Sequence, residues 1–470
     1  MKKLLLYLFL IINCQFPIIN CFGQYTKLLD FVGSSNGSNP YGSLISDGTF
    51  LYGMTYSGGA NNKGTVFKIK TDGTGYSKLL DFANDTLHGY NPLGSLFYDG
   101  TFLYGMTYSG GTYNDGTVFK IKTDGTGYAK LLEFTPANGG MPYGALISDG
   151  TFLYGMTNFG GASNVGTIFK IKTDGTGYAD LMDFNTTNGA YPNGSLISDG
   201  TFLYGVTTGG GIHNVGAVFK IKPDGTGYTK LLDFPDSSNA WIPYGSLVYN
   251  GTNLFGVTNF GGTGTCSDGC GTIFELKPDG TGFSKMLDFT GTANGSFPWG
   301  SLISAGNFLY GMTTSGGIND SGVVYEIKPD GTGYSKLLDF SGAANGSIAF
   351  GSLYTDGTCF YGMTNTGGAN HLGTIFKINP AGMGVAENNL KNDFTISPNP
   401  FSETATLRMT NPQITNPELT IYNVFGQKVY NQFIRNSTFV ISRKDLSDGM
   451  YFLQVKTSEG SSTKKIIIRK

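Results

Sequence analysis

The eleven residues TFLYGMTYSGG occupy positions 49–59, and the same eleven residues recur at positions 101–111. Five further stretches of the chain approximate them. Repetition at a fixed period of about 50 residues is typical of folds in which each repeat buries its apolar faces against its neighbours. The fold therefore depends on the strands that one repeat contains and on how the repeats associate.

A Gly-Ser step, which is Gly-Ala in one copy, begins the phrase GSLISDGT and gives the period. The spacings between successive steps are 52, 50, 50, 51, 55 and 51 residues. We number the repeats 1 to 7 by the glycine of this step: Gly42, Gly94, Gly144, Gly194, Gly245, Gly300 and Gly351.

Each repeat contains four short stretches typical of β-strands, which in repeat 1 are residues 42–46, 49–55, 64–70 and 76–82. We call these strands A to D. Asp47-Gly48 joins the first two, and the Asp-Gly-Thr-Gly of residues 72–75 joins the last two. Asp-Gly pairs accept the positive φ of tight hairpin turns. With 73 glycines and 14% aromatic residues, the chain is predicted to be all-β.

The two ends of the array predict a ring rather than an open stack. Residues 25–31, YTKLLDF, read as a strand D with no A, B or C before them, and the repeat that starts at Gly351 has no strand D. Pairing of the first strand with the last repeat would give a seven-bladed β-propeller without an unpaired edge. An open solenoid would need capping repeats at both ends, and neither end carries one.

The N-terminus reads as a signal peptide, residues 1–23. Lys2 and Lys3 precede an apolar run, and cleavage is expected near Gly23–Gln24. A lipoprotein signal that acylates Cys21 is the alternative interpretation. No later apolar run reaches the length of about 18 residues that a membrane-spanning helix needs, so no transmembrane segment is expected.

The formal net charge of the chain is −2. Proteins that bind nucleic acid usually have a basic surface, so this charge argues against nucleic-acid binding. Cys266 and Cys270 both lie in an insertion between strands B and C of repeat 5. Two cysteines inside one insertion of an exported protein suggest a small loop disulfide, and metal binding by the pair is the less favoured alternative.

After the repeat domain, residues 24–384, a polar linker of residues 385–392 leads to a second domain, residues 393–470. Alternating strands with Asn and Asp-Gly turns predict a small immunoglobulin-like β-sandwich there. This domain has ten Lys and Arg against six Asp and Glu. Its basic balance indicates a module with a partner of its own.

Two resemblances add to this interpretation. The repeats resemble the choice-of-anchor tandem repeat family known as GloVer, whose Gly-x-Val-Phe element appears as GTVF at Gly64 and Gly116. This resemblance implies an exported surface protein and brings no catalytic residues. The segments SPNPF, YNVFGQKV, SDGMYFLQV and KKIIIRK resemble the type A sorting domain of the type IX secretion system. That resemblance implies passage through the periplasm and export by recognition of residues 393–470, with the protein then secreted or held on the outer cell surface.

Function is expected on the loops that vary among the repeats, which join B to C and D to A. The residue before each marker glycine is aromatic in five repeats, and we call these the rim residues: Tyr41, Tyr143, Tyr244, Trp299 and Phe350. The other two repeats have Leu93 and Asn193. Aromatic faces beside polar groups suit sugar rings, so the sequence predicts a binding protein for glycan or another surface polymer. The alternative for these rings is packing at the channel mouth.

Two other functions stay open: a polysaccharide-degrading hydrolase or lyase, and a structural or adhesive surface protein. The three histidines, His88, His213 and His371, do not share a position in the repeat. We therefore predict no metal site, no cofactor and no catalytic residues, and expect that the protein is not an enzyme.

Overall fold

The computed structural model describes residues 24–380, apart from Thr86 and 236–240, and residues 394–469, apart from 410–416, 424–427, 435, 437, 444–445 and 458–459. The chain divides into two compact units, Met1–Ala381 and Gly382–Lys470. The predicted signal peptide and the predicted linker lie outside the described residues. Within the described residues there is no α-helix, and thus no helix that could cross a membrane.

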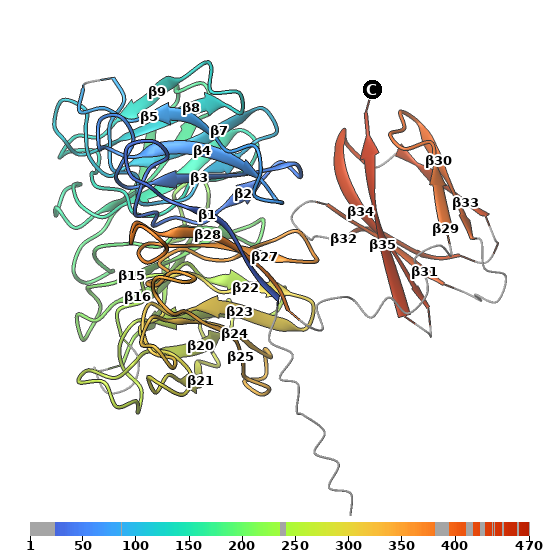
Figure 1. The fold of residues 1–470 in the computed structure, drawn as a ribbon. Coiled ribbons are helices and arrows are strands. Elements are labelled where there is room, and N and C mark those ends of the chain that lie inside the picture. Colours follow the sequence, from blue (N-terminus) through green and yellow to red (C-terminus); the bar gives the residue numbers. More distant parts are fainter. Residues whose placement is uncertain are drawn as a thin grey trace, which may run out of the picture. The chain divides into compact units, whose positions relative to one another are not determined.

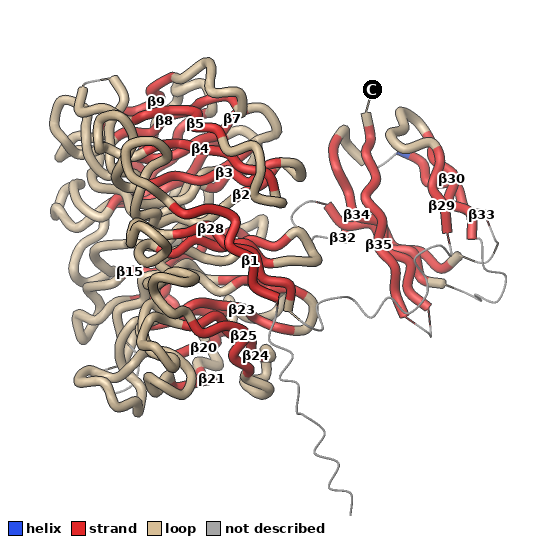
Figure 2. Tube along the Cα trace, in the orientation of Figure 1, coloured by secondary structure: helices blue, strands red, loops and turns tan. Residues whose placement is uncertain are grey.

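The first unit consists of four-stranded antiparallel sheets, one for each repeat, with loops at both ends of the strands (Figures 1 and 2). The sheets of repeats 1 to 3 are β2 (Ile45–Ser46), β3 (Phe50–Thr55), β4 (Thr65–Lys70) and β5 (Ser77–Asp81); β6 (Phe97–Tyr98), β7 (Phe102–Thr107), β8 (Thr117–Lys122) and β9 (Ala129–Glu133); and β10 (Ile147–Ser148), β11 (Phe152–Thr157), β12 (Thr167–Lys172) and β13 (Ala179–Asp183).

The sheets of repeats 4 to 6 have the same strand order. They are β14 (Ile197–Ser198), β15 (Leu203–Thr207), β16 (Ala217–Ile221) and β17 (Thr229–Asp233); β18 (Val248–Tyr249), β19 (Leu254–Thr258), β20 (Thr272–Leu276) and β21 (Ser284–Asp288); and β22 (Ile303–Ala305), β23 (Phe308–Met312), β24 (Val323–Ile327) and β25 (Ser335–Asp339).

The sheet of repeat 7 takes its fourth strand from the start of the chain, as the sequence predicts. β26 (Tyr354–Thr355), β27 (Phe360–Thr364) and β28 (Thr374–Asn379) are followed in the sheet by β1 (Gln24–Asp30). β1 runs antiparallel to β28, with Tyr25 opposite Ile378 and Asp30 opposite Thr374.

Apolar side chains fill the space between successive sheets. Between repeats 1 and 2, for example, Tyr52 and Met54 of β3 pack with Leu103 of β7 and Phe119 of β8. An equivalent cluster joins the last repeat to the first, where Leu51 and Phe67 pack with Tyr361, Met363 and Ile375. Each sheet therefore covers an apolar face of its neighbour. Strands B and C have apolar side chains on both faces because both faces are covered in this way.

Strand A is shorter than the sequence predicts. In repeat 1 only Ile45 and Ser46 pair with β3, although residues 42–46 were predicted as a strand. Residues 42 and 43 instead contact the next repeat, as described below. The predicted turn chemistry is present, since the Asp47 carboxylate accepts the N–H groups of Thr49 and Phe50. The pKa of Asp47 is lowered because these bonds and the Tyr52 hydroxyl outweigh its burial.

The second unit has two sheets around one core. β29 (Phe394–Ser397), β30 (Thr404–Met409) and β33 (Thr438–Ser442) form one; β32 (Lys428–Phe433), β31 (Glu418–Asn423), β34 (Gly449–Thr457) and β35 (Gly460–Ile468) form the other. Side chains from both sheets, including Leu407, Ile421, Leu453 and Ile466, share a single cluster. This arrangement agrees with the predicted sandwich.

Candidate functional site

The marker glycines form the narrowest contact between repeats. A Cβ atom added to Gly94 would lie 2.0 Å from the carbonyl oxygen of Gly144. The same close approach occurs at every step, including the return from Gly351 to Gly42, where the distance is 2.4 Å. Only glycine lets neighbouring backbones approach so closely, so the repeated glycine is a requirement of repeat-to-repeat packing.

In six of the seven repeats the residue after the glycine adds a hydrogen bond in the same direction. The Ser43 N–H donates to Ser95 Oγ at 2.7 Å, and the Ser352 N–H donates to Ser43 Oγ at 2.7 Å. Six hydroxyls accept such a bond, and we call them the serine ring: Ser43, Ser95, Ser195, Ser246, Ser301 and Ser352. Repeat 3 has Ala145 in this position, so the Ser95 N–H has no hydroxyl to donate to.

The rim residues and the serine ring line one cavity of about 100 Å³. Every repeat contributes three consecutive residues to its wall, namely the residue before the glycine, the glycine, and the serine or alanine after it. Tyr41, Tyr143, Tyr244, Trp299 and Phe350 are thus brought together, and Leu93 and Asn193 also line the cavity. The lining includes no Asp, Glu, Lys or Arg.

Four of the five rim residues contact one another. Tyr244 stacks on Trp299 with ring centroids 3.7 Å apart, and Tyr41 stacks on Phe350 at 4.7 Å. Trp299 and Phe350 meet edge to face at 5.1 Å, which joins the two pairs into one arc. All four rings are partly exposed. They therefore pack against each other and still present surface to solvent.

Tyr143 lies apart from this arc and contacts Tyr108 edge to face at 5.2 Å. Tyr41 makes the same kind of contact with Tyr56 at 5.3 Å. Burial raises the pKa of Tyr41, Tyr143 and Tyr244 above the ordinary tyrosine value. A tyrosine hydroxyl is protonated at pH 7 and can donate a hydrogen bond.

The chain that leads to each rim residue is held on two sides. Two residues before the rim position the backbone is left-handed, with φ of 56° at Ile242 and 57° at Ile348. The N–H of this residue donates to the B–C loop of the preceding repeat, as from Phe297 to the Cys270 carbonyl at 2.7 Å. A left-handed β-branched residue costs about 1–2 kcal/mol, so the surrounding contacts must enforce it.

A short β-bridge fixes the same segment to the B–C loop of its own repeat. Ser38 pairs with Ser57 in repeat 1 and Trp241 pairs with Phe260 in repeat 5. The two variable loops of each repeat therefore form one hydrogen-bonded unit. A rim presented from such a unit is rigid, which lowers the entropy that a ligand would have to offset on binding.

Further aromatic side chains on these loops were not predicted as site residues. We call them the outer aromatic group: Phe159, Tyr191, Trp241, Phe260 and Phe297. Phe260 contacts both Trp241, at 5.1 Å, and Phe297, at 5.6 Å; Phe159 contacts Tyr191 at 5.5 Å. Tyr191 is 37% exposed. The signal that could have identified them is variation among repeats at these loop positions, where repeat 1 carries Ser38, Asn39 and Ser57.

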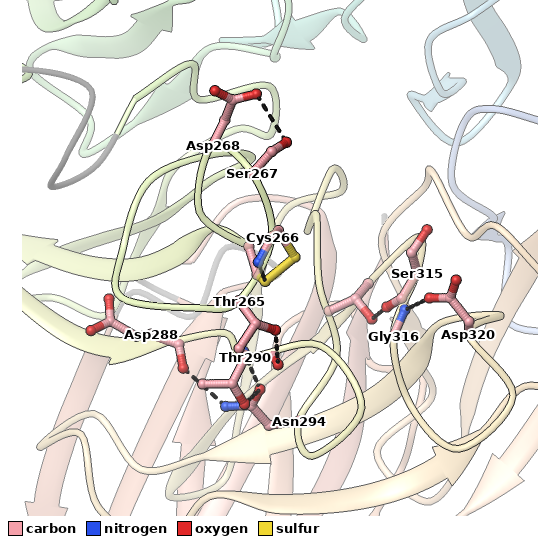
Figure 3. The surroundings of a disulfide bond; sticks show 12 residues. Thr265, Cys266, Ser267, Asp268, Asp288, Thr290, Asn294, Ser315, Gly316 and Asp320 are labelled. Carbon is pink, nitrogen blue, oxygen red and sulfur yellow. Dashed lines mark hydrogen bonds between the residues drawn. A yellow bond between two sulfur atoms is a disulfide. The ribbon is translucent and has the colours of Figure 1, made fainter.

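Cys266 and Cys270 form a disulfide in the lengthened loop of repeat 5 (Figure 3). The bond closes a turn in which the Gly269 N–H donates to the Cys266 carbonyl at 3.1 Å. The Asp268 carbonyl also accepts the indole N–H of Trp241 at 3.4 Å. The insertion thus supports the outer aromatic group from one side.

Titratable side chains do not converge on a reactive centre in the described part of the chain. No group of three or more His, Cys, Asp and Glu with metal-binding geometry occurs among the described residues. His88 pairs with Asp85 at 2.9 Å, whereas His213 and His371 are exposed on loops. Asp320 accepts the Gly316 N–H, which is the role of Asn62, its equivalent in repeat 1.

The chain matches two protein families. The Gloeobacter/Verrucomicrobia repeat matches residues 16–174, 147–269 and 253–406, and the secretion system C-terminal sorting domain matches residues 395–469. Such a sorting domain implies interaction with type IX secretion machinery, and export to the cell surface for attachment or release. No curated protein matches the chain in sequence.

Several solved structures are similar in fold. They include PorZ, a surface component of the type IX secretion system of Porphyromonas gingivalis, with a TM-score of 0.46 and 13% identity; 94% of this chain aligns to 61% of PorZ. Oligogalacturonate lyase from Vibrio parahaemolyticus has a TM-score of 0.50 and 12% identity over 76% of this chain and 93% of that one. The extracellular domain of BT4673 from B. thetaiotaomicron has a TM-score of 0.48 and 12% identity over 95% and 58%. Of these three, the lyase has a TM-score of 0.50, and at 12% identity that likeness bears on the fold alone.

Proposed function

The chain belongs to the Gloeobacter/Verrucomicrobia repeat family, and from that premise we propose that it is an exported binding protein whose rim residues contact a glycan or another surface polymer. The proposal includes a closed seven-bladed propeller as the scaffold. Support for closure comes from the glycine contacts and the serine bonds, both of which return from repeat 7 to repeat 1. Export would run through the periplasm, directed by a signal peptide at residues 1–23.

One observation carries the binding proposal. Five aromatic side chains from five repeats converge on a single cavity, remain partly exposed, and are held by loops under backbone strain. Strained segments are concentrated at functional sites. Aromatic faces beside hydroxyl donors combine stacking with orientation, which is the chemistry that sugar rings require.

We further propose that the protein binds without catalysing a reaction. A glycosidase needs two carboxyl groups at a set separation beside the sugar. The cavity lining has none, and Asp85 and Asp320 are engaged in their own loops. Oligogalacturonate lyase activity belongs to a protein of similar fold and gives the hydrolase or lyase alternative its only specific support.

The two tryptophans of the chain, Trp241 and Trp299, both lie on the variable loops, so intrinsic fluorescence reports on the proposed site. The test is titration of the full-length protein with a panel of polysaccharides, first for the native protein and then for Trp299→Leu. Leucine is the residue that repeat 2 carries in this position, at Leu93, so the fold accommodates it.

We expect polysaccharide binding in the native protein, measured by fluorescence and by isothermal titration calorimetry, and at least about tenfold weaker binding in Trp299→Leu. Tyr98→Leu is the matched control, because Tyr98 is a partly buried aromatic at the hairpin end of strand A, away from the variable loops. Unchanged affinity in Trp299→Leu, or equal loss in both variants, would contradict the proposal.

A further inference from the structure

The serine ring has a property that the binding proposal does not use. Each of its six Oγ atoms accepts a backbone N–H from the neighbouring repeat at 2.7–2.8 Å. None of these hydroxyls donates its own proton to a protein acceptor among the described residues. A serine hydroxyl has one proton to donate besides its acceptor sites, so six O–H donors remain unused around the cavity.

The carbonyl groups of the same wall do not offset these donors. Each marker glycine carbonyl lies against the marker glycine of the preceding repeat, as the 2.0 Å separation between the Gly144 oxygen and a Cβ placed on Gly94 shows. These oxygens are therefore directed along the ring. The glycine carbonyls of the wall thus face the neighbouring repeat.

Two more donors break the symmetry of the ring. The Ser95 N–H lacks the hydroxyl acceptor that every other repeat supplies, because Ala145 stands in that position. In the same repeat as Ala145, Tyr143 contributes a protonated hydroxyl to the cavity lining. The side of the cavity formed by repeats 2 and 3 thus has a backbone N–H that no hydroxyl of the ring accepts.

We propose that the serine ring binds a carboxylate group, which enters between the rim residues. A carboxylate has two oxygens and about four acceptor sites and no proton to donate, so it matches a wall of O–H and N–H donors. No acidic side chain lines the cavity to repel it. The inference rests on the proposed function in one respect: a uronic acid would place its ring against the rim aromatics while its carboxylate reaches the serine ring.

The experiment compares D-glucuronate, D-glucose and acetate as probes of the full-length protein, by isothermal titration calorimetry and tryptophan fluorescence at pH 7. D-glucuronate is expected to bind at least about tenfold more tightly than D-glucose, since charge-assisted hydrogen bonds are about twice as strong as neutral ones. Binding of acetate without binding of either sugar would assign the site to free carboxylates. That result would support the carboxylate site and would contradict the proposed glycan binding. Equal affinity for glucuronate and glucose, or binding of none of the three probes, would overturn the carboxylate site.

Ala145→Ser separates a ligand-binding role from a structural one. The new hydroxyl would accept the Ser95 N–H and supply an O–H donor in its place, so glucuronate affinity should stay within about twofold of the native value while the melting temperature rises. Tyr143→Phe, which removes one donor and keeps the ring, should weaken glucuronate binding and leave glucose binding unchanged. Glucuronate affinity in Tyr143→Phe that equals the native value would also refute the site.

Discussion

The marker glycine and the residue before it are adjacent in sequence, but only the glycine is the same in every repeat of the chain. All seven repeats have glycine at the first position, whereas the second holds Tyr, Leu, Asn, Trp or Phe. The glycine touches the backbone of the next repeat, and the rim side chain faces a cavity. A position that is uniform across repeats is fixed by packing, and a position that varies is free to serve a ligand.

The largest expected effect is at the uniform position. Gly94→Ala places a Cβ 2.0 Å from the Gly144 carbonyl oxygen, so the two repeats must separate. We expect a loss of about 3 kcal/mol in the free energy of unfolding, measured by urea denaturation. Gly48→Ala is the control, because its turn has open space and a φ of 92°; its cost should be about 1 kcal/mol. Equal losses would show that the contact between repeats is not the constraint.

Tyr325 is a departure from uniformity in the core. The other six repeats carry phenylalanine in this position, and the Tyr325 hydroxyl is buried without a hydrogen-bond partner. Tyr325→Phe should therefore raise the free energy of unfolding by about 1–2 kcal/mol. The reverse change in repeat 5, Phe274→Tyr, should lower it. A stability loss in Tyr325→Phe would mean that the hydroxyl has a structural role.

Ala145 is the corresponding departure in the serine ring. Ala145→Ser would complete the ring and should stabilise the protein by about 1 kcal/mol, the net contribution of one hydrogen bond. Ser195→Ala removes an existing bond from Ala145 N–H and should cost a similar amount. Thermal unfolding of both variants checks the pair. Opposite signs are expected, and a change in the same direction for both would contradict the hydrogen-bond account.

The smallest effect concerns the outer strand of repeat 3. Other repeats pair a lysine with an acid three residues later, as Lys78 does with Asp81 at 2.8 Å, but repeat 3 has Asp180 and Asp183. Burial, and then the charge of Asp183, raise the pKa of Asp180 to about 6. The folded state therefore binds this proton more tightly than the unfolded chain does. The stability it contributes is present at low pH and is lost as pH rises through about 6.

Asp180→Lys should consequently stabilise the protein more at pH 7.5 than at pH 4.5. Because solvent still reaches the partly buried Asp180 side chain and screens its charge, we expect a difference of about 1 kcal/mol at most. Melting temperatures of the native protein and the variant at the two pH values measure it. Asp180→Asn is the matched control, since it removes the repulsion without restoring the ion pair. A gain that is larger at pH 4.5 would have the wrong sign.

The sequence alone predicted the features that depend on order along the chain. The spacing of Gly42, Gly94 and their equivalents predicted the repeats, and the unpaired strand at residues 25–31 predicted the pairing of β1 with β28. It also predicted the pairing of Cys266 with Cys270 and the positions of the rim residues, because each follows from a local pattern.

The features that depend on contact between repeats could not be predicted. Nothing in the sequence near Ser43 indicates that its N–H donates to Ser95, which lies 52 residues away. Left-handed backbone at Ile242 and Ile348 runs against the intrinsic preference of isoleucine and is imposed by the surrounding loops. The stacking of Tyr244 on Trp299 likewise depends on how closely two repeats approach.

The most direct test of the difference between the marker glycines and the rim residues measures stability and ligand binding together in Trp299→Leu. Our account predicts a melting temperature within a few degrees of the native value and a loss of polysaccharide binding of at least about tenfold. A large fall in melting temperature with unchanged binding would contradict it. The stacked rings of the rim would then be part of the packing between repeats, like the glycines beside them.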